Sequence, residues 1–274
     1  EPEPEPELPD FPGEFYEITN NYDWNIEYKV GAYEKEQGDK FGNSVAIDGT
    51  TVIVGAWYEG TGGANTGAAY IFERNGDGSW NSTETQKIQA TDKHSNDYFG
   101  TSVAISGTTA IVGAYDDQTG NFRTGSAYIF ERNGNTWIQV QKIVSSYRFS
   151  SDKFGWSVAI DGTTAIVGAY KHGTKDKGLA YIFERNGDGT WGNEIVQGTQ
   201  TYRTETYKIQ GNDTGNYHYF GNSVAISGTT AIVGSYGEDT SAGAVYIFER
   251  NGDGTWGNEV VGQTYRTQTH KIQG

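Results

Sequence analysis

The chain of 274 residues contains no cysteine, no methionine, only five prolines and no run of about 18 apolar residues. Without cysteine, neither a disulfide framework nor a thiolate metal site can form. No basic flank followed by an apolar stretch marks a signal peptide. A signal peptide or membrane anchor would therefore lie outside these residues, and the missing initiator leads us to expect a segment of a longer product.

Basic residues are scarce as well, and the formal net charge is −15. This balance argues against nucleic acid as a partner, because nucleic-acid-binding surfaces need clustered Lys and Arg. The opening "EPEPEPELPDFPG" contains all five prolines. We predict that residues 1–25 form an acidic, Pro-rich spacer, with a docking peptide as the alternative.

The chain does contain a sequence repeat that occurs four times. "FGNSVAIDGTTVIVGA" begins at Phe41, and close copies begin at Phe99, Phe154 and Phe220. A repeat of this length with several short strand patterns is typical of propeller blades. The sequence therefore predicts an all-β fold over residues 26–274, a β-propeller of four-stranded antiparallel blades that could be part of a larger one.

Each repeat predicts the four strands of a blade. Two apolar runs flank the pair Asp48-Gly49, which we expect to form the centre of a tight hairpin with positive φ at both residues. The second run, "TVIVGA", is apolar on consecutive positions, as in a strand covered on both faces. "AAYIFERN" predicts the third strand, and the more polar "TETQKIQA" an outer fourth strand. The recurrent Glu-Arg pair of "FERN" is expected to hold neighbouring blades or turns together rather than to bind a ligand.

The quoted repeat, with "GAAYIFERNGDGSW" after it, resembles the FG-GAP repeat, the β-propeller blade of the integrin α-subunit head and of many microbial and algal surface proteins. The resemblance covers roughly residues 29–274. It implies an extracellular or cell-surface recognition or adhesion module. Integrin blades often carry an Asp-rich calcium loop between the first two strands, whereas this chain has two-residue turns there, too short to surround the ion. We therefore expect no metal and no cofactor, with calcium as the remaining candidate.

No catalytic pattern is recognisable, so we predict a non-enzymatic protein. The four histidines lack metal-ligand spacing, and no G-x-S-x-G elbow is present. One alternative function is the non-catalytic domain of a hydrolase, which would need a catalytic domain beyond these residues.

Loops on one face of the propeller are the predicted recognition site, because the loops after the second strand and the connectors between blades vary while the strands do not. The partner would be a protein or a glycan. An aromatic residue recurs directly after the second strand, and charged residues adjoin it; the predicted face comprises Trp57, Tyr58, Tyr115, Asp116, Asp117, Tyr170, Lys171, Tyr236, Glu238 and Asp239. The alternative is that the aromatics only cap the core. Sequons at Asn81 and Asn212 agree with a glycosylated, secreted protein.

The number of predicted strands bears on whether the blades close into a ring. "IEYKV" at residues 26–30 resembles a fourth strand without the other three, and "THKIQG" ends the chain with another. We expect either further repeats or a second copy that pairs with a self-association strand containing Ile26, Tyr28 and Val30. The rival function is thus a structural subunit of a surface fibre or coat, a homo-oligomer or filament assembled through edge strands.

Overall fold

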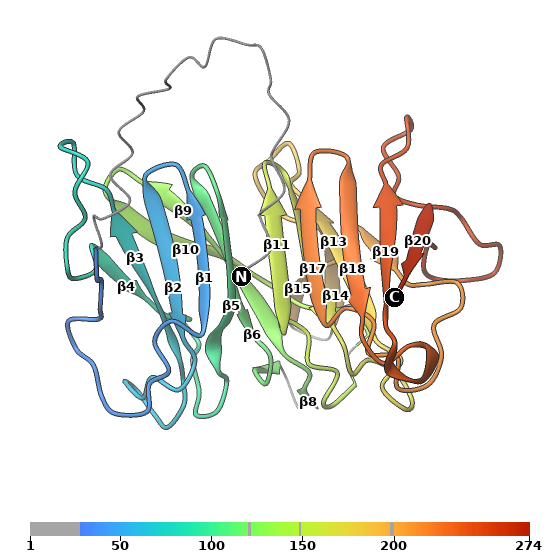
Figure 1. Ribbon diagram of the computed structural model, residues 1–274, viewed down its shortest axis with the longest axis horizontal. Coiled ribbons are helices and arrows are strands. Elements are labelled where there is room, and N and C mark those ends of the chain that lie inside the picture. The colour runs from blue at the N-terminus through green and yellow to red at the C-terminus, as the bar shows by residue number, and fades with distance from the viewer. Residues whose placement is uncertain (1–27, 120–121, 148, 198–199) are drawn as a thin grey trace, which may run out of the picture.

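The computed structural model describes residues 28–119, 122–147, 149–197 and 200–274, and within them four antiparallel sheets stand side by side (Figure 1). Each sheet contains one four-stranded blade, which confirms the predicted all-β propeller architecture. Blade 1 contains β1 (Ser44–Asp48), β2 (Thr51–Ala56), β3 (Ala68–Glu73) and β4 (Gln86–Ile88). Blade 2 contains β5 (Phe99–Ser106), β6 (Thr109–Ala114), β9 (Ser126–Asn133) and β10 (Thr136–Ile143). Blade 3 contains β11 (Ser157–Asp161), β12 (Thr164–Ala169), β13 (Leu179–Glu184) and β16 (Tyr207–Ile209). Blade 4 contains β17 (Ser223–Ser227), β18 (Thr230–Ser235), β19 (Ala244–Glu249) and β20 (His270–Gln273).

Two small hairpins and one short 3-10 turn lie outside the four-stranded blades. The hairpins are β7 (Gln118–Thr119) with β8 (Phe122–Arg123), and β14 (Asn193–Gln197) with β15 (Gln200–Thr204); the 3-10 turn is η1 (Asp239–Ser241). The second hairpin leaves blade 3 between its third and fourth strands, and β15 pairs in parallel with β10 at Ile143 and Arg203. Blade 2 thereby becomes part of a six-stranded sheet.

The turn between the first two strands of a blade lies one residue later than the sequence suggested. Asp48 pairs with Thr51, so Gly49 and Thr50 are the two central residues. Only the glycine has a positive φ, 55° at Gly49. The expectation of positive φ at both residues of an Asp-Gly centre is therefore wrong, because this turn needs a left-handed residue only at its first central position.

Neighbouring blades pack through an apolar interface that recurs three times. We call the side of a blade toward the next blade in sequence its trailing face, and the opposite side its leading face. Ile53 and Ile88 on the trailing face of blade 1 lie in one buried cluster with Val103 and Ile105 on the leading face of blade 2. Equivalent clusters join blade 2 to blade 3 and blade 3 to blade 4.

The Phe-Gly pair that opens each repeat fits into the blade before it. The Gly100 carbonyl accepts a hydrogen bond of 2.8 Å from Ser44 Oγ. A Cβ atom on Gly55 would lie 2.0 Å from that carbonyl oxygen, so only glycine allows the approach. The same contacts recur at Ser102, Gly113 and Gly155, and at Ser157, Gly168 and Gly221.

Polar contacts farther from the Phe-Gly pair also join neighbouring blades. The acid or serine that ends each first strand accepts the amide of the next blade's turn; the pairs are Asp48–Gly107 (2.5 Å), Ser106–Gly162 (3.0 Å) and Asp161–Gly228 (2.6 Å). The Glu-Arg pairs also connect blades, as the sequence suggested. The ion pairs are Glu73–Arg132 (3.5 Å), Glu131–Arg185 (2.6 Å) and Glu184–Arg250 (3.0 Å).

The two outermost faces are open, so the described blades do not close into a ring. Val45 and Ile47 on the leading face of blade 1 are 67% and 65% exposed, against 8% for Val103 and 8% for Ile105 at the same positions of blade 2. On the trailing face of blade 4, the equivalents of two buried isoleucines are exposed; they are Ile232 (39%) and Ile272 (58%).

Candidate functional site

The variable loops and the connectors between blades share the lower end of the molecule in Figure 1, and the tight turns lie at the upper end. We call this lower end the loop face. The second strand of every blade ends there, so the aromatic residue that follows it is placed on the loop face by the strand itself. These residues are Trp57, Tyr115, Tyr170 and Tyr236.

Aromatic residues from the connectors lie between these four and make the row continuous. Tyr98 stacks on Tyr115 with ring centroids 5.0 Å apart, and Tyr219 stacks on Tyr236 at 4.8 Å. Trp156 bridges Tyr115 at 5.2 Å and Tyr170 at 4.8 Å. We call the whole set the aromatic band; it comprises Trp57, Tyr58, Tyr98, Tyr115, Trp156, Tyr170, Tyr219 and Tyr236.

The sequence-based search missed Tyr98, Trp156 and Tyr219. Each adjoins a Phe-Gly pair, in "DYFG", "FGW" and "HYFG". An aromatic beside Phe-Gly in three consecutive repeats was the available signal. It was overlooked because these residues fall on either side of the pair and so do not align as one repeat position.

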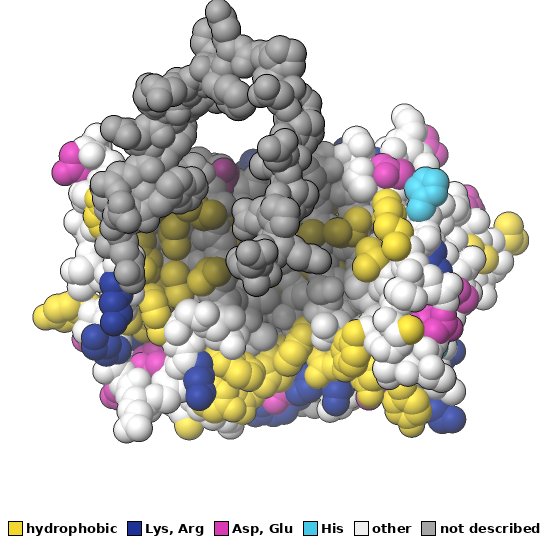
Figure 2. All heavy atoms as spheres, in the orientation of Figure 1, with side chains coloured by type: hydrophobic (Ala, Val, Ile, Leu, Met, Phe, Trp, Pro, Cys, Tyr) yellow, Lys and Arg dark blue, Asp and Glu magenta, His cyan; other side chains and the backbone are white. Residues whose placement is uncertain are grey.

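The aromatic band is partly open to solvent. Tyr58 and Tyr236 are 38% and 50% exposed, and the other members are half-buried. Figure 2 shows hydrophobic side chains with Lys and Arg among them along the lower edge of the molecule. The rings therefore pack on one another and still present a surface to solvent.

Charged groups flank the middle of the band. Lys153 Nζ lies 4.7 Å from the centre of the Tyr115 ring and 2.7 Å from Asp116 Oδ1. Arg123 contacts the second oxygen of Asp116 at 3.4 Å. Lys171 Nζ lies 5.7 Å from the centre of the Tyr170 ring. Asp116 is thus neutralised by two cations, whereas Asp239 in η1 is exposed.

Four phenols of the band, those of Tyr98, Tyr115, Tyr170 and Tyr236, stay protonated at physiological pH. Burial, with a smaller effect from neighbouring groups, raises the pKa of Tyr98, Tyr115, Tyr170 and Tyr236 above the ordinary value. A protonated phenol both donates and accepts hydrogen bonds. The band therefore combines apolar ring surface with neutral polar groups.

Two of the predicted recognition residues are buried and do not belong to this surface. Asp117 accepts hydrogen bonds from Ser126 Oγ at 2.6 Å and Tyr128 OH at 2.9 Å, and pairs with Lys142 at 2.8 Å. The Glu238 carboxylate contacts the Tyr246 hydroxyl and the Lys271 ammonium. The prediction that Asp117 and Glu238 belong to the recognition face is therefore wrong. The loop turns their side chains inward because each satisfies a buried Tyr and Lys of its own blade.

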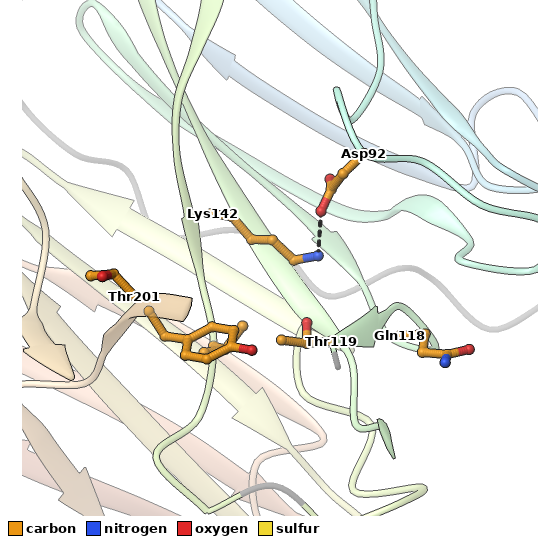
Figure 3. Close-up of a pocket in the computed structure, with 7 residues that line it drawn as sticks. Asp92, Gln118, Thr119, Lys142 and Thr201 are labelled. Atoms are coloured by element: carbon orange, nitrogen blue, oxygen red, sulfur yellow. Dashed lines mark hydrogen bonds and ion pairs between the residues drawn. The ribbon is translucent and has the colours of Figure 1, made fainter. Parts of the chain in front are cut away.

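A polar cleft of about 370 Å³ adjoins the Asp117 cluster, between blade 2 and the β14–β15 hairpin (Figure 3). Lys142 lines it and binds Asp92 at 2.7 Å as well as Asp117. Burial lowers the pKa of Lys142, but the two carboxylates outweigh it and hold this pKa above the ordinary value. The lysine therefore remains a cation with its charge compensated, and it serves to support the loop.

Carboxylates in the tight turns have protein partners. Asp48 and Asp161 bind the turn of the next blade, and Asp77, Asp188 and Asp253 each accept from the Ser or Thr two residues later. Within the described ranges, no three His, Asp or Glu residues are grouped to hold a metal ion. The same part of the chain contains no helix that is long and apolar enough to cross a membrane.

The remaining predicted residues lie on other surfaces. Asn81 and Asn212 are exposed. Ile26 and the spacer at 1–25 fall outside the described residues. Tyr28 is exposed and Val30 half-buried, and neither is part of a regular strand. The adjacent Gly31 forms a parallel bridge with Thr83 of blade 1.

Four repeated blades, with a continuous aromatic band across their loop ends, define a repeat β-propeller with a loop-borne surface. Sequence comparison gives the family: FG-GAP repeats match at residues 24–72, 82–130, 137–183 and 204–248. Together these segments span more than half of the chain, which therefore belongs to the FG-GAP repeat family. Such repeats are typical of extracellular and surface proteins. No curated protein matches the chain significantly.

The matched segments also clarify where one repeat starts. The last three begin at or shortly before the outer strand of one blade, and all four end in the third strand of a blade. The first match begins at residue 24, so the segment around Tyr28 to Gly31 has the position in its match that an outer strand has in the other three, although it forms no regular strand. β20 lies beyond the fourth match, in the position that opens a further repeat.

Proposed function

We propose that this protein is a non-enzymatic, extracellular recognition module that binds a protein or a glycan through its loop face. The aromatic band is the single observation that carries the proposal. FG-GAP propellers often serve adhesion or recognition, and the band supplies a surface on which a partner can dock.

The chemistry of the band suits an extended, largely uncharged ligand. Aromatic rings offer large contact areas at low entropic cost, and their protonated hydroxyls add hydrogen bonds. Because the ring contacts pass through all four blades, a polymer laid along the loop face would meet several of them at once. Lys171 and Asp239 at the border supply charges that can set orientation.

Binding is tested with arrays of immobilised glycans and of extracellular protein domains, followed by titration of the best ligand. Tyr236→Ala and Trp57→Ala are expected to weaken that binding by roughly tenfold or more, which corresponds to about 1.4 kcal/mol. Tyr33→Ala is the matched control, because Tyr33 is 77% exposed and lies outside the band. Equal affinity of all three variants and the parent chain would refute the proposed role of the loop face.

The rival role, a self-assembling surface subunit, depends on other parts of the molecule. Its contacts would be made by the two open faces at the ends of the row of blades, and a protein could have both properties.

A further inference from the structure

The open trailing face of blade 4 has the form of a vacant binding site for a Phe-Gly pair. In blades 1 to 3 the equivalent site holds the Phe-Gly of the next blade. In blade 4 a groove of about 430 Å³ occupies this position, lined by residues that include Ser223, Gly234, Ala244 and Val245. A Cβ on Gly234 would meet only the Ser223 hydroxyl within 3 Å, whereas a Cβ on Gly55 would collide with the Gly100 carbonyl.

Blade 1 offers the matching half of the contact. Phe41 packs edge-on against Tyr70 and Phe72, as Phe99 does against its own blade. Gly42, however, has no atom within 4 Å of the position of a Cβ, whereas the Cβ of Gly100 would lie 2.3 Å from the Ala68 carbonyl oxygen. The Phe-Gly of blade 1 is therefore shaped for a site that no described residue supplies.

The polar contacts that join neighbouring blades are also incomplete at both ends of the row of described blades. Among the described residues, Glu249 on blade 4 has no arginine partner and Arg74 on blade 1 has no carboxylate partner, although their equivalents form the three inter-blade ion pairs. Ser223 and Ser227 likewise lack the bonds that Ser44 and Asp48 make to the next blade. The two ends are complementary in charge, in hydrogen bonding and in shape.

We propose that the trailing face of blade 4 binds the leading face of blade 1 of a second copy of this chain. The contact repeats the interface that already joins neighbouring blades: Gly42 of one copy enters the groove at Gly234 of the other, and Arg74 pairs with Glu249. Val45 and Ile47 then cover Ile232 and Ile272. Because the two surfaces differ, the contact is head-to-tail and yields a closed ring if the rotation closes or a filament if it does not.

One segment has to move for this contact to form. Gly31 contacts Thr83 of blade 1 in the way that Ile209 at the end of β16 contacts Arg266 of blade 4. The incoming β20 would occupy the place now taken by residues 28–31. β20 pairs with β19 at four positions, whereas Gly31 makes one bridge, so the N-terminal segment is the one released.

Sedimentation velocity of the full 274-residue chain, from about 1 to 100 μM, tests the proposal. We expect concentration-dependent dimers or larger species. Gly234→Ala should weaken association by roughly tenfold or more, because the new Cβ would collide with the Gly42 carbonyl. The monomer should still fold, since the only close atom is the end of the Ser223 side chain. Gly252→Ala is the control: its Cβ meets nothing within 4 Å.

Reversing the charges of the proposed Arg74–Glu249 ion pair provides a second, independent test of the contact. Glu249→Arg and Arg74→Glu should each reduce association, because each places like charges opposite one another. The double variant should restore it, because the pair is then re-formed with its charges exchanged between copies. A chain that remains monomeric at the highest concentration, or associates equally with Gly234→Ala, would overturn the proposal. The recognition role of the loop face would be unaffected by that result.

Discussion

At the scale of single residues, the four copies of one side chain have different surroundings. The tyrosine in the third strand is Tyr70, Tyr128, Tyr181 or Tyr246, and each is buried. Tyr128 OH binds Asp92 at 3.0 Å and Asp117 at 2.9 Å, whereas the Tyr70 hydroxyl finds no hydrogen-bond partner among the described residues. Loops that differ between the repeats therefore determine whether a framework tyrosine contributes hydrogen bonds or only apolar contacts.

Matched Tyr→Phe substitutions measure this difference. We expect Tyr128→Phe to lower the free energy of unfolding by about 1–3 kcal/mol, because two hydrogen bonds to carboxylates are lost. Tyr70→Phe should leave it unchanged or raise it slightly, because a buried hydroxyl without a partner is removed. Urea unfolding of both variants gives the comparison. Equal losses would show that the hydrogen bonds of Tyr128 add nothing.

The charge of Asp97 opposes folding at neutral pH. Asp97 is 1% exposed, one of its oxygens has no hydrogen-bond partner in the described part of the chain, and burial together with the nearby Asp117 raises its pKa from 3.8 to about 6. A carboxyl with a raised pKa binds a proton more tightly in the folded state. Its contribution to stability is therefore fully present below about pH 4 and is lost as the pH rises through about 6.

Asp97→Asn should remove this pH dependence. At pH 7 we expect the variant to be more stable than the parent by about 1–3 kcal/mol, since one pKa unit corresponds to about 1.4 kcal/mol. The amide oxygen can still accept the hydrogen bond that the His94 amide donates to Asp97 Oδ2 at 2.5 Å. At pH 4 the two proteins should have nearly equal free energies of unfolding. A difference that is the same at both pH values would rule out the protonation of Asp97 as its cause.

At the scale of elements, the glycine in the second strand of each blade depends on the neighbouring blade. Gly113 in β6 faces the Gly155 carbonyl, and a Cβ there would lie 1.9 Å from the oxygen. Gly234 occupies the same position in β18, where the described residues place no carbonyl of a neighbouring blade against it. The local sequences around the two are nearly identical, so any difference in tolerance comes from packing between elements.

Alanine at these two positions separates strand propensity from inter-blade contact. Gly113→Ala should destabilise the protein by about 3 kcal/mol or more, because the blades must move apart. Gly234→Ala should cost less than about 1 kcal/mol in the monomer, since only the Ser223 hydroxyl has to rotate. Thermal unfolding at low protein concentration measures both. Similar losses at the two sites would contradict the role assigned to the Gly155 carbonyl.

At the scale of the whole molecule, the row of blades has two unlike ends and one continuous face. The loop face derives its aromatic band from residues of all four blades. The ends carry the halves of an interface that is completed three times inside the molecule. The two features are separate surfaces, so recognition and assembly can be tested separately.

Much of the fold follows from the sequence, because the determinants are local and repeated. Alternating or continuous apolar runs, a glycine at each turn and the Phe-Gly pair are enough to predict four four-stranded blades and the end at which the loops gather. The FG-GAP resemblance rests on the same residues. Trp57, Tyr115, Tyr170 and Tyr236 could be assigned to one face, because the strand that precedes each of them has a predictable direction.

Other properties of this protein depend on contacts between residues far apart in the chain, and only the tertiary structure decided them. Asp117 and Asp116 are neighbours in sequence, yet one is buried against Tyr128 and the other lies beside the aromatic band. Trp57 contacts Tyr115 only because two neighbouring blades bring them together. The same apolar pattern is buried in β5 and exposed in β1. The sequence by itself determined which surfaces each blade has, whereas the position of the blade in the row decided which of them remain open, because burial depends on the neighbour that covers a face.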